Sequence, residues 1–185
     1  PDALVHGITV DNGANFQRAA RETQGEDSVL PCTAHTLQLC VRDVIKTAPW
    51  APVISVSKSL VKQIKHKSAV TAKYKAACVV NGQTAIQLKG ECETRWGAQY
   101  DMLDSLLQRK EVIIDIARHL EDDLGAAINQ PFWAAVEHMH MILKQFRELI
   151  AWAQADSPGR ISELYFKLKQ LCASLDNQTG LGGNA

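Results

Sequence analysis

The stretch Ile8-Thr9-Val10-Asp11-Asn12-Gly13-Ala14-Asn15-Phe16 decides how the chain begins to fold. The run from Ala3 to Val10 is short, apolar and rich in β-branched side chains, which predicts a buried strand. It stops at Asp11-Asn12-Gly13, three residues that favour a turn. A second strand is expected from Ser28 to Cys32, parallel to the first, with a short helix from Ala14 to Glu22 between them.

Helical periodicity dominates the chain after residue 50. Apolar residues recur three and four positions apart over 53–64, 102–117, 133–150 and 161–175, and each of these segments is expected to form an amphipathic helix. A loop is expected over residues 81–90. The predicted fold class is therefore α+β and mostly helical, with an α/β unit over residues 1–50 and a helical domain over residues 51–185.

Length and composition restrict the class of protein. The 185 residues are 46% hydrophobic and 22% charged, which is typical of a globular domain. No apolar run approaches the roughly 20 residues that cross a bilayer, so no membrane association is expected. Five cysteines at irregular spacing indicate reduced thiols in an intracellular protein. Because the chain begins with Pro1 rather than methionine, we expect it to be an internal piece of a larger protein.

Two short motifs near the N-terminus carry candidate site residues. Asp11 follows a predicted buried strand, where α/β sheets place their ligands, and such an aspartate can hold a divalent cation for phosphoryl transfer. The alternative is an ordinary turn that ends the strand. Cys32 and His35 have C-x-x-H spacing and can share a zinc ion, but a structural zinc needs four ligands and no second pair has suitable spacing. The sequence favours a packing role, in which this pair fixes the helix near Ala34 against the strand that bears Asp11.

Two further features suggest contact with nucleic acid. Arg95 offers a planar donor fork for phosphate and Trp96 a ring on which a base can stack, although a capped helix start with a core tryptophan is the alternative. No acidic residue occurs between Val44 and Gly90, whereas eight lysines do: Lys46, Lys58, Lys62, Lys65, Lys67, Lys73, Lys75 and Lys89. Lys58, Lys62 and Lys65 fall on one predicted helix face that can contact DNA phosphates, and an ordinary solvated face explains them equally well.

The order of these motifs resembles the hAT transposase family. Its members show a strand running into Asp-Asn-x-x-Asn, a C-x-x-H-x-Leu-x-Leu element and a Thr-Arg-Trp ahead of a helix; the matching residues here are 11–15, 32–39 and 94–96. The later helical segments are also similar to that family's helical insertion, so the resemblance covers essentially the whole chain. Gly97-Ala98 departs from the commoner Asn-Ser after the tryptophan, and Gly13 departs from a usual alanine.

The resemblance implies a partial ribonuclease-H-like α/β core followed by an all-helical insertion domain that is incomplete at its C-terminal end. It also implies that Asp11 is the second acid of an Asp–Asp–Glu triad binding Mg²⁺ or Mn²⁺, and that Arg95 and Trp96 approach DNA during hairpin formation. The first aspartate is expected before Pro1 and the glutamate beyond Ala185, so the chain alone is expected to be inactive. The implied partners are transposon-end DNA, target DNA and further copies of the full-length protein, in the nucleus.

Three functions agree with these observations. The first is part of a DNA transposase that catalyses metal-dependent strand cleavage and transfer. The second is a domesticated relative that binds DNA or regulates other processes without catalysis. The third is a helical protein-interaction module with accidental motifs, which would be favoured if Asp11 lay on a helix rather than after a strand.

Overall fold

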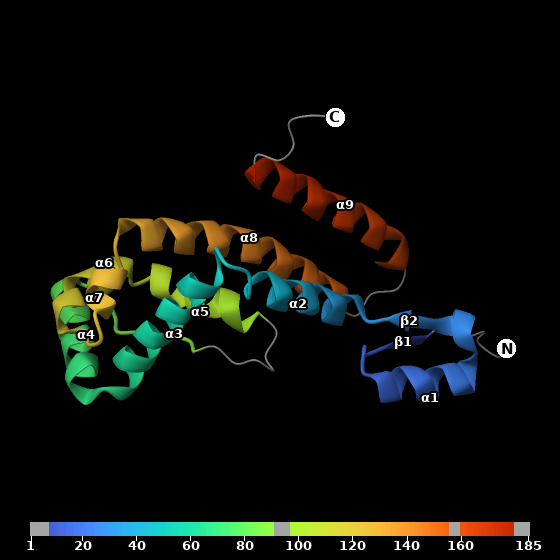
Figure 1. The fold of residues 1–185 in the computed structure, drawn as a ribbon, viewed down its shortest axis with the longest axis horizontal. Coiled ribbons are helices and arrows are strands. Elements are labelled where there is room, and N and C mark those ends of the chain that lie inside the picture. The colour runs from blue at the N-terminus through green and yellow to red at the C-terminus, as the bar shows by residue number, and fades with distance from the viewer. Residues whose placement is uncertain (1–7, 91–96, 156–159, 180–185) are drawn as a thin grey trace. The chain divides into compact units, whose positions relative to one another are not determined.

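The structure is a computed structural model that describes residues 8–90, 97–155 and 160–179. Helices dominate it (Figure 1), and the predicted α+β, mostly helical class is confirmed. None of the described helices is both long enough and apolar enough to cross a membrane. The elements follow in the order β1 (Ile8–Val10), α1 (Ala14–Gln24), η1 (Glu26–Ser28), β2 (Val29–Pro31), α2 (Thr33–Val44), α3 (Ala51–His66), α4 (Ser68–Val80), α5 (Ala98–Leu107), α6 (Lys110–Asp115), η2 (Ala117–His119), α7 (Leu124–Ala127), α8 (Gln130–Gln154) and α9 (Arg160–Thr179).

The chain divides into two compact units. Residues 1–42 and 148–185 form the first, here called the sheet unit, and residues 43–147 form the second, the helical unit. Helices α2 and α8 each have residues in both units. The domain boundary predicted between residues 50 and 51 stays a prediction.

The sheet unit contains the two strands expected from the sequence. β1 and β2 pair in parallel, with Ile8 opposite Val29, Thr9 opposite Leu30 and Val10 opposite Pro31. Helix α1 connects the strands and packs against both, as the crossover of a parallel pair must. Pro31 has no backbone N–H to donate, and the next bond between the two segments runs from the Cys32 N–H to the carbonyl oxygen of Val10 at 2.8 Å. The expected parallel pairing is confirmed over these residues, and Asp11 follows directly after β1.

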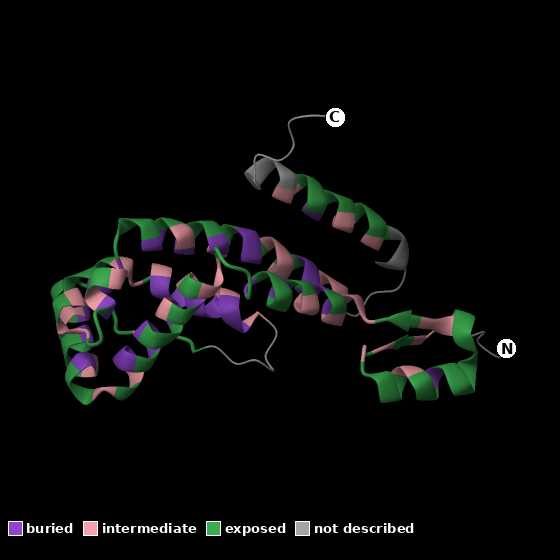
Figure 2. Ribbon diagram, viewed as in Figure 1, coloured by how far each residue is buried: buried purple, intermediate pink, exposed green. Residues whose placement is uncertain are grey.

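The helical unit holds a closely packed apolar core. Helices α3 and α4 pack against each other, and α5 contacts both α3 and α6. Figure 2 shows buried positions along α5 and α8. Side chains from α3, α5, α6 and α8 are at most 1% exposed: Leu60, Met102, Leu103, Leu106, Ile113, Trp133 and Val136. The expected loop over residues 81–90 is present, since this segment contains a turn and no helix or strand.

One helix expected from the sequence is broken in the structure. The apolar spacing predicts a single helix over residues 102–117, but α5 ends at Leu107 and α6 starts only at Lys110. Arg109 adopts φ −126° and ψ 20°, outside the helical region. Its guanidinium donates hydrogen bonds to the carbonyl oxygen of Gln108 (2.7 Å) and to that of Thr84 (2.9 Å). The arginine side chain therefore satisfies a carbonyl at the break and ties it to the loop before α5.

Candidate functional site

The two carboxylate oxygens of Asp11 differ in their contacts, because only Oδ1 has polar partners among the described residues. Its side chain is 58% exposed. Oδ1 accepts a hydrogen bond from the backbone N–H of Asn12 at 2.6 Å and lies 2.9 Å from Nδ1 of His35. Oδ2 has no hydrogen-bond partner among the described residues. The arrangement orients the carboxylate through one oxygen and leaves the other directed to a ligand or to solvent.

The C-x-x-H motif lies against the end of β1. The backbone N–H of Cys32 donates to the carbonyl oxygen of Val10 at 2.8 Å. The Thr36 hydroxyl donates to the carbonyl oxygen of Cys32 (3.1 Å) and accepts from Nδ2 of Asn12 (3.2 Å). Together with His35, these contacts hold the first turn of α2 against the strand that ends at Asp11. The two motifs are therefore one structural cluster.

The described residues contain no group of three potential metal ligands. Within residues 8–90, 97–155 and 160–179 no three His, Cys, Asp or Glu side chains are placed to hold one metal ion together. The Cys32 thiol is free and half-buried. That Cys32 and His35 complete no zinc site within this chain stays a prediction, as does the metal-binding role of Asp11.

The lysine-rich segment is less uniform than its sequence. Lys58 and Lys62 are exposed on α3, whereas Lys65 is half-buried. Two other lysines face acids from outside the acid-free segment: Lys67 pairs with Glu121, and Lys89 Nζ lies 3.9 Å from Oδ1 of Asp101. Among the described residues, no ion-pair partner faces Lys46, Lys62, Lys65, Lys73 or Lys75. The positive charge that remains uncompensated is concentrated on α3 and α4.

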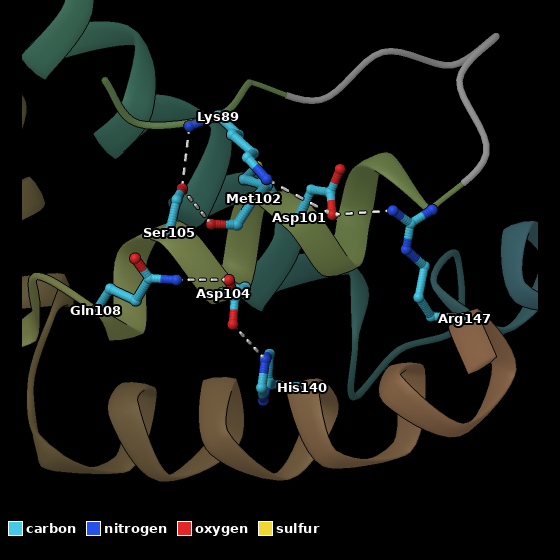
Figure 3. Close-up of polar contacts among 8 residues, drawn as sticks. All are labelled: Lys89, Asp101, Met102, Asp104, Ser105, Gln108, His140 and Arg147. Carbon is cyan, nitrogen blue, oxygen red and sulfur yellow. Dashed lines mark hydrogen bonds and ion pairs between the residues drawn. The ribbon is translucent and has the colours of Figure 1, made fainter. Parts of the chain in front are cut away.

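A buried aspartate organises the start of α5. The Asp101 side chain is 9% exposed, and its Oδ1 lies 3.6 Å from Nη2 of Arg147 on α8 as well as near Lys89 (Figure 3). Gly97, directly before α5, has φ +72°, and a Cβ at this position would lie 2.7 Å from Nη1 of Arg147. The absence of a side chain at residue 97 therefore lets the guanidinium approach.

A second polar link joins α5 to α8. Oδ1 of Asp104 lies 3.0 Å from Nε2 of His140, and Oδ2 accepts a hydrogen bond from Gln108 at 2.7 Å (Figure 3). The His140 ring stacks on Tyr100, with 4.7 Å between centroids. Ser105 accepts a hydrogen bond from the backbone N–H of Lys89 at 3.0 Å and so ties the preceding loop to the same helix.

Sequence reasoning missed this α5–α8 network. The available signal was polar residues among the apolar positions of α5, since Asp101 and Ser105 interrupt the buried run Met102, Leu103 and Leu106. A carboxylate on a buried helix face requires a partner, and that requirement predicts a basic residue on a neighbouring helix. The sequence does not show which one, because Arg147 is distant along the chain.

Arg95 and Trp96, predicted to contact DNA, lie outside the described residues. The helix expected after them is present, since α5 begins at Ala98. Their roles stay predictions.

A family and a curated relative match this chain. The family described as the ZBED1 RNase-like helical domain matches residues 30–142. The chain belongs to this family. A human protein named "Zinc finger BED domain-containing protein 4" is 26% identical over 146 residues, which are 77% of this chain and 12% of that protein. The chain thus spans about an eighth of the relative's length. No solved structure matches.

The extent of the RNase-like helical match bears on the candidate residues. It begins within β2 and ends within α8, and so includes the C-x-x-H motif, the lysine-rich segment and Asp104 with His140. Asp11 lies before the matched region. The hAT-like resemblance is confirmed at the level of the family. That the chain is part of a transposase remains a proposal.

Proposed function

We propose that this chain is part of a transposase-derived protein in which Asp11 serves as a metal ligand for DNA strand cleavage and transfer. The observation that carries the proposal is the Asp11 carboxylate, placed at the carboxyl end of a parallel strand, oriented through Oδ1 and open at Oδ2. Open α/β sheets bind their ligands at that end of their strands.

The oxygen donors at this point fit Mg²⁺ or Mn²⁺. Both ions prefer carboxylate and carbonyl oxygens, and Asp11 Oδ2 is such a donor. Asn12 Oδ1 is a second oxygen of this kind, buried and without a hydrogen-bond partner among the described residues. When bound, the ions supply Lewis acidity to the attacking and leaving oxygens of a phosphodiester. One carboxylate does not hold such an ion tightly, so the catalytic proposal requires further acids beside Asp11.

His35 is a positioning residue in this proposal. Its Nδ1 contact fixes the rotation of the Asp11 carboxylate, and the Asn12 backbone N–H adds a second restraint on the same oxygen. Groups that orient a metal ligand in this way typically contribute about 10–100-fold to metal affinity or activity. The C-x-x-H motif therefore acts through Asp11 rather than on the DNA itself.

DNA binding by the helical unit is the second part of the proposal. The lysines of α3 and α4 supply a polyanion-binding surface, and phosphate contacts by lysine are independent of base sequence and weaken with salt. Each duplex phosphate contact contributes about 0.9 to the slope of log affinity against log salt. Replacing Lys58, Lys62 and Lys65 with Gln is therefore expected to reduce this slope by up to about three. Lys67→Gln is the control, because its ammonium already pairs with Glu121.

A domesticated protein that binds DNA without catalysis is the second candidate. It is favoured by the extent of the family match, which includes the lysine-rich helices and leaves out Asp11. The two candidates share the DNA-binding surface and differ only in the use of Asp11.

Asp11→Asn in the full-length protein separates the two candidates. Cleavage of transposon-end DNA with Mg²⁺ or Mn²⁺ is measured beside DNA affinity, with Asp27→Asn as the control because Asp27 is an exposed acid of the same unit. A transposase loses cleavage in Asp11→Asn, retains it in the control and binds DNA equally in both. If Asp11→Asn cleaves as well as the control, or if the wild-type protein cleaves nothing, the catalytic proposal is wrong.

A further inference from the structure

The helical unit contains a preformed pocket beside the lysine-rich helices. It has a volume of about 320 Å³ and is lined by the end of α3, the first half of α4 and residues 85–88. This last segment has no regular secondary structure, yet it is anchored at several points. The Tyr74 hydroxyl donates to the carbonyl oxygen of Ile86 at 3.0 Å, and Leu88 is 1% exposed. Arg109 and Ser105 hold the residues on either side, so the wall is fixed before any ligand arrives.

Two uncompensated lysines line this pocket. Lys65 comes from α3 and Lys75 from α4, and neither has an ion-pair partner in the part of the chain that the structure describes. The Lys65 ammonium extends toward the loop, because a Cβ on Gly90 would lie 3.7 Å from its Nζ. Because no acid occurs between Val44 and Gly90, no carboxylate of this segment repels an anion that enters the pocket. The charge of the pocket is complementary to phosphate.

The remaining walls exclude a bare phosphate site. Ala85 and Ile86 give the lining an accessible apolar part, and the Gln87 side chain supplies an amide with both donors and an acceptor. A volume of about 320 Å³ lies at the lower end of the ~300–1,000 Å³ range of small-molecule pockets, which admits one small planar ligand and excludes a duplex. An anionic group joined to a flat, hydrogen-bonding apolar ring has the matching chemistry.

We propose that this pocket binds one nucleotide, with its phosphate between Lys65 and Lys75 and its base against the apolar wall beside Gln87. The nucleotide belongs to a single DNA strand, and this part of the inference rests on the proposed function. In this arrangement the pocket gives the lysine-rich surface one discrete contact for an unpaired nucleotide, in addition to its general attraction for duplex phosphates.

The test compares two charge-matched double variants of the 185-residue chain. Lys65→Gln/Lys75→Gln removes both lysines of the pocket, and Lys62→Gln/Lys73→Gln removes two exposed lysines of the same helices that do not line it. Ala85→Phe fills the pocket and leaves every charge in place. Binding of a labelled oligothymidine strand, a labelled duplex and thymidine 5′-monophosphate is measured by fluorescence anisotropy and by NMR shifts.

Lys65→Gln/Lys75→Gln is expected to bind the single strand about tenfold more weakly, as the loss of a charge-assisted phosphate contact predicts. Ala85→Phe is expected to weaken binding of the single strand by a similar factor, because the phenyl ring occupies the space of the nucleotide. Both variants should also lose thymidine monophosphate binding, while the lysine control changes strand affinity about twofold. Equal weakening by both double variants, or no effect of Ala85→Phe, overturns the pocket proposal and leaves DNA binding intact. Binding of the monophosphate without any DNA binding refutes the proposed DNA contact and upholds the pocket as a site for a free nucleotide.

Discussion

Gly97→Ala tests the packing at the start of α5 more directly than any other single change. Gly97 has φ +72°, and Gly82, in the loop after α4, has φ +63°. An alanine in this left-handed region costs about 1–2 kcal/mol at either position. The two sites differ in their surroundings: a Cβ at residue 82 meets nothing within 4 Å, whereas one at residue 97 lies 2.7 Å from Nη1 and 2.8 Å from Cδ of Arg147.

The added cost at residue 97 comes from displacing Arg147. This guanidinium lies 3.6 Å from the Asp101 carboxylate, whose side chain is 9% exposed and which the Lys89 ammonium approaches only to 3.9 Å. Removing a partner from a buried charged group costs about 1–3 kcal/mol. Gly82→Ala is therefore expected to reduce the free energy of unfolding by about 1–2 kcal/mol, and Gly97→Ala by about 2–5 kcal/mol.

Urea unfolding, followed by circular dichroism and tryptophan fluorescence, measures both variants against wild type. The Arg147→Ala background separates the cost of backbone strain from the cost of the lost contact with Asp101. In that background the methyl group introduced by Gly97→Ala has no Arg147 guanidinium to displace. The further cost of Gly97→Ala should therefore fall to about 1–2 kcal/mol, which is the conformational part alone. Equal costs for Gly82→Ala and Gly97→Ala in the wild-type background would refute the argument that Arg147 requires a glycine there.

Two further predictions concern an ionisation and a pair of tryptophans. Burial raises the pKa of Tyr74 to about 12, with Cys78 adding to the effect, so the folded state retains this proton more strongly than the unfolded state, whose pKa is 10. The contribution of this group to the free energy of unfolding is unchanged below pH 10 and falls as the pH rises from 10 to 12. Tyr74→Phe should lack that fall when urea unfolding is measured across this pH range. Parallel pH profiles of the variant and the wild type would contradict the prediction. Trp133→Ala, at a site 1% exposed, should cost about 3–5 kcal/mol of stability. Trp96→Ala in the full-length protein should instead leave the melting temperature nearly unchanged and impair hairpin formation or strand transfer, and a large loss of stability there would show that Trp96 is a core residue.

The parts of the fold that sequence predicted are those determined by neighbouring residues. The β-branched run before Asp11 and the apolar spacing of α3, α8 and α9 are local patterns, and each produced the expected element. The break between α5 and α6 was not predictable in this way. No glycine or proline occurs at residues 108 and 109, and the break is stabilised by a bond from Arg109 to Thr84, 25 residues earlier.

Charge counting along the sequence misjudged the lysine-rich segment for a similar reason. The segment contains no acid, so the sequence shows no nearby partner for any of its eight lysines. In the structure Lys67 pairs with Glu121, which is 54 residues away, and Lys89 lies near the buried Asp101. Compensation of charge depends on which helices pack together. The lysines whose charge stays available to an anion are therefore those left without acids after the fold has formed.

The cluster at Asp11 shows how separate motifs can become one site. Asp11 and His35 are 24 residues apart, and each is a weak signal by itself. Parallel pairing of β1 and β2 brings the carboxyl ends of both strands to the same edge, and the C-x-x-H motif follows β2 directly. The two motifs must then meet, and the 2.9 Å contact between His35 and Asp11 is the consequence. Any change that shifts the register of this strand pair would separate the histidine from the carboxylate, so the orientation of Asp11 depends on the pairing as much as on either residue.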